Sequence, residues 1–295
     1  MASIMTNAAA LTALQSLNNT NKALETTQGR ISTGYRVATA SDNAAYWSIA
    51  TSMRSDNQAL SAVQDALGLG AGKVDTAYTA ITNIKDQVDA IKSKLVTARG
   101  ASQDNQQKIA TEIKAIQDQI KSSVTNASYA GSNLLQNDGT AASDLQIVAS
   151  YNRTGTTVAI DTITVKSSDT QVLDTAGTGG IVGGLLATTF FDPSAAAVSD
   201  TNIDTALDSV ETALAKLATG AAYLGAAKSR IDTQKSFLSN LSDSIDKGVG
   251  ALVDADMNKE STRLQALQVQ QQLGIQALSI ANGNSQSILA LFKNG

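Results

Sequence analysis

Apolar residues recur every three or four positions over most of the N-terminal and C-terminal parts of the chain. Residues 74–95 and 109–124 show this spacing, and residues 203–252 repeat it after the middle of the chain. This is the period of an amphipathic helix. The last stretch, about 50 residues at about 1.5 Å each, would be about 75 Å long. Helices of this length are typical of coiled coils and rods, and the only proline, Pro193, lies outside all three stretches.

The middle of the chain follows a different pattern. Residues 144–165 alternate β-branched and polar residues on either side of Asn152-Arg153-Thr154-Gly155, which predicts a β-hairpin with its turn at these four positions. Residues 175–184 are rich in Gly and Thr and predict a loop. The expected fold is therefore mainly α with a small β insertion, and the helices at the two ends of the chain lie side by side.

The composition narrows the chemistry that this chain can perform. It contains no histidine and no cysteine, which excludes Ser-His-Asp and Cys-His nucleophile pairs, imidazole or thiolate metal sites, and disulfides. Lys and Arg number 22 against 26 Asp and Glu, a net charge of -4, which argues against nucleic acid as a partner. We interpret carboxylate pairs such as Asp254 and Asp256 as solvated helix faces. We expect no catalytic residue, no cofactor and no bound metal.

A glycine-rich stretch at residues 68–74 invites comparison with a phosphate-binding loop. It reads Gly-Leu-Gly-Ala-Gly-Lys-Val. A Walker loop has Gly five residues before the Gly-Lys pair and Ser or Thr after the lysine. Here Leu67 and Val74 occupy those positions, so we interpret the stretch as a flexible junction within the helices.

Acidic residues between Asp200 and Glu211 match several ligand positions of an EF-hand loop. The position that needs glycine for the sharp turn is Thr205. The helical stripe that starts at Ile203 also requires helix here, not loop. We interpret the stretch as a helix N-terminus, where acidic side chains are favoured by the helix dipole.

Two uncharged segments raise the question of membrane targeting. Residues 1–21 lack the basic n-region of a secretory signal peptide. Residues 264–292 are also uncharged and long enough to span a bilayer. They contain many Gln and Asn residues, whose amides would lack partners in hydrocarbon. We therefore expect neither a cleaved signal peptide nor insertion into a membrane.

The C-terminal segment carries more apolar surface than one docking contact needs. With about 100° of rotation per residue, its apolar residues spread over an arc of about 200°, whereas a helix that docks once shows about 100°. One face would pack on near-heptad apolar positions at the N-terminus, and the other on neighbouring subunits. The alternative is a helix buried inside one globule. The predicted interface residues are Ile4, Leu11, Leu14, Leu17, Leu24, Ile31, Leu264, Leu267, Leu273, Leu278, Ile280, Ile288, Leu291 and Phe292.

Both ends of the chain resemble bacterial flagellins. Ser3-Ile4 with Thr6-Asn7 is similar to the opening of that family, and residues 30–36, Arg-Ile-Ser-Thr-Gly-Tyr-Arg, are similar to its most recognisable N-terminal block. Tyr46-Trp47 is similar to the alphaproteobacterial branch. The C-terminal resemblance rests on Asp254, Asp256, Met257, Glu260, Leu264, Gln271, Gln272, Gly274, Leu278, Ala281, Asn282, Gln286, Leu289 and Leu291. The family-motif residues are Arg30, Ser32, Gly34, Arg36, Asp42 and Asn282.

The resemblance implies a division of the chain into domains. Residues 1–40 and 251–295 would form an inner coiled-coil polymerisation domain. Residues 41–139 and 200–250 would form an α-helical rod domain. Residues 140–199, with the predicted hairpin, would be a surface-exposed variable region.

The resemblance also implies a function. The chain would be a structural subunit that polymerises into the extracellular flagellar filament, alone or mixed with other flagellins, after type III export. Its partners would be copies of itself, an export chaperone, the filament cap and hook-associated proteins. The alternative is a hook–filament junction protein, which shares similar termini but does not polymerise alone. In enteric flagellins an innate immune Toll-like receptor recognises a helix of the rod domain. In the matching stretch of this chain, Asp89 and Ala90 stand where that helix has a Gln-Arg pair.

Overall fold

The fold is described from a computed structural model, which covers residues 7–155, 157–194 and 196–293, with side chains as far as residue 283. It is mainly helical, with small β elements in the middle of the chain, as the sequence predicts. The residues fall into two compact units. The first unit combines Met1–Asn57 with Asp243–Gly295, and the second consists of Gln58–Ser242.

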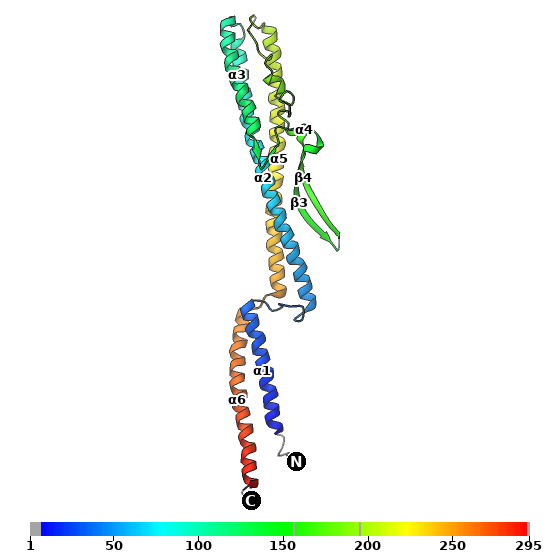
Figure 1. Ribbon diagram of the computed structural model, residues 1–295, viewed down its shortest axis with the longest axis vertical. Coiled ribbons are helices and arrows are strands. Elements are labelled where there is room, and N and C mark those ends of the chain that lie inside the picture. The colour runs from blue at the N-terminus through cyan, green and yellow to red at the C-terminus, as the bar shows by residue number, and fades with distance from the viewer. Residues whose placement is uncertain (1–6, 156, 195, 294–295) are drawn as a thin grey trace. The chain divides into compact units, whose positions relative to one another are not determined.

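The first unit brings both ends of the chain together. Helix α1, Ala8–Thr33, and helix α6, Met257–Lys293, run side by side in opposite directions (Figure 1). Helix α2, Ala44–Ala98, begins in this unit, and helix α5, Asp200–Val253, ends in it. A small core between them consists of Val37, Ala50, Val249 and Val253.

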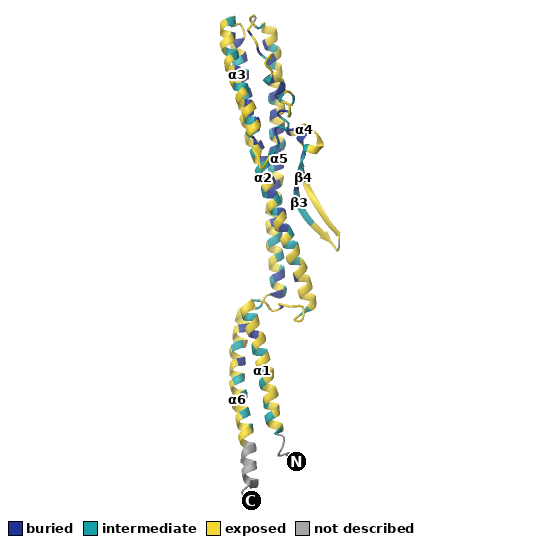
Figure 2. Cartoon of the chain, viewed as in Figure 1, coloured by how far each residue is buried: buried dark blue, intermediate teal, exposed yellow. Residues whose placement is uncertain are grey.

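The second unit is built around the remaining parts of α2 and α5, together with helix α3, Gln103–Asn126. The apolar residues that recur every three or four positions line the inner sides of these helices, where Figure 2 shows stripes of buried residues. The pattern thus predicts the core of this unit directly. Its largest fully buried helical side chains are Leu67, Ile81, Ile84, Ile91, Leu95, Ile113, Ile120, Ile203, Leu217 and Leu224.

The predicted hairpin is present in the second unit. Strand β3, Leu145–Thr154, pairs antiparallel with strand β4, Thr157–Val165. Strand β3 continues through residues 152–154, which the sequence pattern assigns to the turn. The tight connection begins only at Gly155, whose φ of +66° suits a residue without a side chain.

A second, shorter hairpin follows α3 and is not predicted by the sequence pattern. Strands β1, Ser128–Tyr129, and β2, Ser132–Asn133, pair across Ala130 and Gly131, which have φ values of +49° and +76°. Positive φ at both central positions is the geometry of tight hairpin turns. Strands of two residues are too short to show alternation, so periodicity gives no signal for them.

The longer hairpin rests on the helices only at its inner end. Ile147 and Ile163 are opposite one another in the register and are buried, whereas most of residues 152–162 are exposed. The Gln234 side chain of α5 donates to the carbonyl of Ala149 at 2.9 Å. Further loop segments are held by helix α4, Ser167–Thr170, and by 3₁₀ turns at Ala141–Ser143 and Gly183–Leu186.

Two motifs that suggested ligand sites lie inside helices. Residues 68–74 are continuous α2, so our interpretation of this stretch as a flexible junction is wrong, and no phosphate-binding loop exists here. Gly70 instead provides space, because a Cβ there would lie 2.6 Å from Ile147 of β3. Asp200–Glu211 forms the first turns of α5, which excludes an EF-hand loop. Within the described part of the chain, no group of acidic side chains is arranged to hold a metal ion, and no helix has an apolar stretch that could cross a membrane.

We expect the two neighbouring glycines to respond oppositely to alanine. Gly70→Ala should lower the free energy of unfolding of the second unit by about 1–3 kcal/mol, since the added methyl overlaps the buried Ile147 side chain. Gly68→Ala should raise it by about 0.5–1 kcal/mol, because a Cβ at Gly68 meets nothing within 4 Å and alanine favours helix. Thermal unfolding followed by circular dichroism measures both. A Gly70→Ala protein as stable as Gly68→Ala would contradict this packing role.

Candidate assembly interface

Helices α1 and α6 pair through a narrow seam. In α6 the covered positions alternate steps of four and three residues and include Glu260, Leu264, Leu267, Gln271 and Gly274. In α1 the covered positions repeat in the same way and include Leu17, Leu24, Thr27 and Ile31. This spacing is typical of a coiled coil. Leu11, although near-heptad in the sequence, is 59 % exposed and lies outside the seam.

Polar contacts cross the seam along its length. The side chain of Asn7 caps α1 by accepting from the backbone N–H of Ala10 at 3.0 Å, and its amide donates to the carbonyl of Ala281 at 2.9 Å. Further along, the Gln271 amide donates to the Asn21 side-chain oxygen at 2.8 Å. These contacts join the two ends of the sequence in place of a large apolar core.

Glycine lets the two helices approach closely. A Cβ at Gly274 would lie 3.2 Å from Cδ1 of Leu17, which is tighter than an ordinary van der Waals contact. Among the described side chains, the buried ones are Thr27 in α1 and Glu260 and Leu267 in α6. The pairing therefore hides little apolar surface within one subunit.

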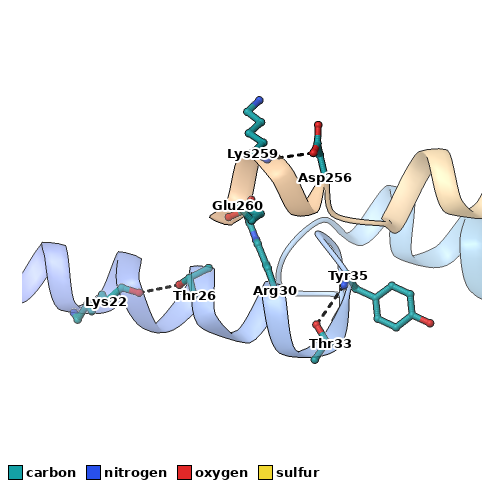
Figure 3. A network of polar contacts seen from close by, with 8 residues as sticks. All are labelled: Lys22, Thr26, Arg30, Thr33, Tyr35, Asp256, Lys259 and Glu260. Carbon is teal, nitrogen blue, oxygen red and sulfur yellow. Dashed lines mark hydrogen bonds and ion pairs between the residues drawn. The ribbon is translucent and has the colours of Figure 1, made fainter. Parts of the chain in front are cut away.

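Among the described side chains of this seam, Glu260 is the one charged residue that is buried, with an exposed fraction of 6 %. Its Oε1 accepts from Nη1 of Arg30 at 3.3 Å, and the Arg30 side chain reaches from α1 toward α6 in Figure 3. Among the described residues, no hydrogen-bond donor reaches the other carboxylate oxygen, Oε2. The seam thus contains an ion pair in which the carboxylate is buried and the guanidinium is partly exposed, joined by a single contact.

The loop after α1 is held to the break between α5 and α6. Gly34 ends α1 with φ +76°, and its carbonyl accepts from the backbone N–H of Ala255 at 2.8 Å. The backbone N–H of Arg36 donates to the carbonyl of Val253 at 2.6 Å. The Arg36 guanidinium donates to the carbonyl of Leu252 at 2.7 Å. The motif residues Gly34 and Arg36 therefore tie the end of α1 to the connection between α5 and α6.

The back of α6, opposite the seam, carries exposed apolar side chains. With about 100° of rotation per residue and Leu267 of the seam taken as zero, Val269 lies near 200°, Ile280 near 220° and Leu273 near 240°, so all three point to the opposite side of the helix. Their exposed fractions are 56 %, 58 % and 67 %. Figure 2 shows the outer sides of α1 and α6 as largely exposed. The alternative of a helix buried inside one globule is therefore wrong for the described side chains.

The predicted interface residues divide into distinct groups. Leu17, Leu24, Ile31, Leu264 and Leu278 are half-buried in the seam, and Leu267 is buried there. Leu11, Leu14, Leu273 and Ile280 are exposed. The motif residues Ser32 and Asn282 are exposed as well. Ile4 lies outside the described residues, and Ile288, Leu291 and Phe292 lie outside the described side chains.

Comparison with known proteins gives matches at both ends and over the whole length. A family model of the bacterial flagellin N-terminal helical region matches residues 4–140, and one of the C-terminal helical region matches residues 207–292. A protein named flagellin from Brucella melitensis is 65 % identical over 293 residues, covering 99 % of this chain and all of that protein. Flagellin C of Rhizobium meliloti is 49 % identical over 321 residues, with the same coverage.

The chain belongs to the bacterial flagellin family.

Members of this family are structural subunits of the flagellar filament, which lies outside the cell. Both organisms are alphaproteobacteria, as the Tyr46-Trp47 pair suggests. The two flagellin models leave residues 141–206 unmatched, and this stretch contains the exposed outer part of the β3–β4 hairpin. The alignment with flagellin A of Rhizobium meliloti runs over 395 residues at 39 % identity, more than the 295 residues of this chain, so that flagellin carries additional residues.

The flagellin motif residue Asp42 organises the loop before α2. Its Oδ2 accepts from the backbone N–H of Thr39 at 2.9 Å, from the Thr39 hydroxyl at 3.1 Å and from the backbone N–H of Ala38 at 3.1 Å. Hydrogen bonds from the Thr39 backbone and then from its hydroxyl hold the pKa of Asp42 below its usual value. Asn43 follows and accepts from the backbone N–H of Tyr46, which caps α2.

We expect the pKa of Asp42 to rise when the Thr39 hydroxyl is removed. Thr39→Val keeps the side-chain shape and the backbone donors, so the pKa should move only part of the way back. Because the folded pKa is lowered, this group stabilises the loop at pH values above the ordinary aspartate pKa of about 3.9, and the contribution is lost as the pH falls through the folded value. Carboxyl carbon chemical shifts followed by NMR titration give the midpoint. An unchanged midpoint in Thr39→Val would contradict the hydroxyl contribution.

Proposed function

We propose that this chain is a filament-forming flagellin that polymerises through its paired terminal helices. The observation that carries the proposal is the row of exposed apolar residues, Val269, Leu273 and Ile280, on the side of α6 that faces away from α1. One subunit cannot cover this row, because α1 already occupies the opposite side of the helix. Copies of the same chain would cover it.

The free energy of burying this row between subunits also favours assembly. Burial of one Leu or Ile side chain contributes about 1.5–3 kcal/mol. In a helical polymer the same contact recurs at every subunit, so a few such residues on each copy are enough to hold a filament together. Catalysis has no place in this role, and the proposed function is structural.

We propose the same three-part domain division that the resemblance implies. The heptad seam supports residues 1–40 and 251–295 as the inner polymerisation domain. The helical core of the second unit supports residues 41–139 and 200–250 as the rod. The outer end of the hairpin, near Gly155, supports residues 140–199 as the region that reaches the filament surface, although the inner end of this hairpin is buried on the rod helices.

We propose the further partners that the resemblance to flagellins implies, and the exposed row gives a physical reason for one of them. Before assembly, apolar residues such as Leu273 and Ile280 would favour aggregation in the cytoplasm unless they are covered. A chaperone that binds the C-terminal segment during export would cover them. The filament cap and the hook-associated proteins would meet the same helices at the two ends of the filament, and other flagellins could share it.

Seeded growth tests the proposal. Purified protein added to short filament fragments should elongate them, as seen by electron microscopy and light scattering. A hook–filament junction protein would bind fragment ends without elongating them, so this outcome would favour the alternative. Each of the relatives above is named a flagellin, which supports the filament subunit.

A further inference from the structure

We propose that Arg30 and Glu260 are a positioning pair, which forms within each subunit and fixes the rotation of α6 so that its apolar row faces outward. This inference rests on the proposed function, since the row matters only if it is the assembly surface. The starting observation is a charged side chain, Glu260, that is 6 % exposed in a helix pair which otherwise buries very little.

Apolar residues alone do not fix the rotation of α6. Taking the direction of Leu267 as zero and about 100° per residue, Ile275 lies near 80°, Val269 near 200° and Leu273 near 240°. Each of these directions offers an apolar side chain that could pack on α1. A helix that is apolar on several sides has competing ways to dock, and such alternatives are commonly suppressed by a single buried polar residue.

Glu260 can perform this selection because of its direction. It lies near 20° on the same scale, in line with Leu267 and Leu278 and opposite the exposed row. Its carboxylate meets Nη1 of Arg30 at 3.3 Å. If α6 turned to bury Leu273 or Val269 against α1, Glu260 would leave Arg30 and the pair would be broken.

The other contacts in the seam do not select one rotation of α6. Other contacts across it in the described part of the chain include two amide hydrogen bonds, Asn7 to Ala281 and Gln271 to Asn21, and a close approach at Gly274. Neutral amides can be solvated in either arrangement at small cost, whereas a buried carboxylate that loses its cation is strongly disfavoured. The penalty for a wrong rotation is therefore concentrated at Glu260.

Charge reversal tests the pair. Arg30→Glu and Glu260→Arg should each raise the critical concentration for seeded elongation by about 100-fold, because each leaves two like charges facing one another at a position where one of them is buried. The double variant, in which the two charges are exchanged, should have a critical concentration close to that of the wild type. A neutral double variant, Arg30→Gln with Glu260→Gln, should also have a lower critical concentration than either single reversal. It provides a second test if the exchanged charges do not fit the seam. If neither double variant improves on the single ones, charge pairing does not position α6.

A mixture of the two single variants separates pairing within a subunit from pairing between subunits. Arg30→Glu and Glu260→Arg proteins mixed in equal amounts should fail to elongate seeds, because each chain keeps two like charges facing one another. Elongation by the mixture would show that the pair closes between chains and would overturn the proposal. So would elongation of either single variant at the wild-type critical concentration.

A matched control comes from an exposed ion pair of the second unit. Arg99 and Asp204 lie 3.1 Å apart, with side chains 55 % and 46 % exposed. Reversal of either charge there should change the critical concentration little, since exposed pairs contribute little to stability. Circular dichroism of every variant checks that the subunit keeps its helical fold. Wild-type protein that fails to elongate seeds would contradict the proposed function itself, a result distinct from failure of the pair.

Discussion

Replacing Ile280 by aspartate is expected to stop seeded elongation while the isolated subunit stays folded. Ile280 is 67 % exposed, so the substitution removes almost no contact within the subunit. In a filament the same position would be covered by a neighbour, where an unpaired carboxylate is costly and the apolar contact is lost. Together these effects should slow elongation by about 1000-fold or more. Light scattering and electron microscopy with wild-type seeds measure the rate.

The choice of Ile280 depends on the structure. Leu278, two residues earlier, belongs to the predicted interface but is half-buried in the seam with α1, so a charge there would also disturb the subunit itself. Val158→Asp is a matched control, because Val158 is 47 % exposed and lies on strand β4, far along the sequence from α6. It should elongate seeds normally. Wild-type elongation by Ile280→Asp would show that the back of α6 is not the assembly surface.

Amide hydrogen exchange is expected to separate the two units in the monomer and to change most in α1 and α6 on assembly. In the subunit, α1 contains one buried residue, Thr27, whereas the helices of the second unit share a continuous core. Protection follows the free energy of local opening, and each 1.4 kcal/mol changes it about tenfold. Covering the apolar row in the filament should therefore slow exchange in α1 and α6 by about 100-fold or more.

The same measurement contains its own control. Amides of α2 and α5 near the fully buried Ile81 and Leu217 should be slow in the monomer and in the filament alike. Exchange resolved by peptide mass spectrometry distinguishes these segments. Equal protection of α1 and the core of the second unit in the monomer would mean that the terminal helices are already stable without neighbours. It would contradict the expectation that assembly stabilises α1 and α6.

The helices and their core were predictable because their signal is local. Ile81, Ile84, Val88, Ile91 and Leu95 recur at the helical period and are all buried, since burial against another helix needs nothing but a continuous apolar face. The longer hairpin was predictable for a similar reason, because its β-branched residues surround a glycine that can adopt positive φ. The shorter hairpin at Ala130 and Gly131 could not be predicted from residue spacing, since strands of two residues are too short to show a pattern.

The glycines of α2 illustrate what local pattern cannot decide. Gly68 and Gly70 occupy equivalent surroundings in the sequence, and a run of glycines inside a helical stretch suggests flexibility. The structure places Ile147 of a distant strand against Gly70 and nothing against Gly68. Close approach between segments far apart in the sequence is a tertiary property, so the same residue type marks a packing contact at one position and open space at the other.

The sequence by itself determined that the two ends of this chain form long paired helices and that the C-terminal segment has more apolar surface than one partner can cover, because both follow from the spacing of apolar residues. Only the tertiary structure decided which of these residues face α1 and which remain outward, such as Leu267 in the seam and Ile280 on the back. An arc of about 200° contains several equivalent docking directions. The choice among them depends on contacts with residues more than 200 positions away in the sequence, such as the ion pair of Arg30 with Glu260.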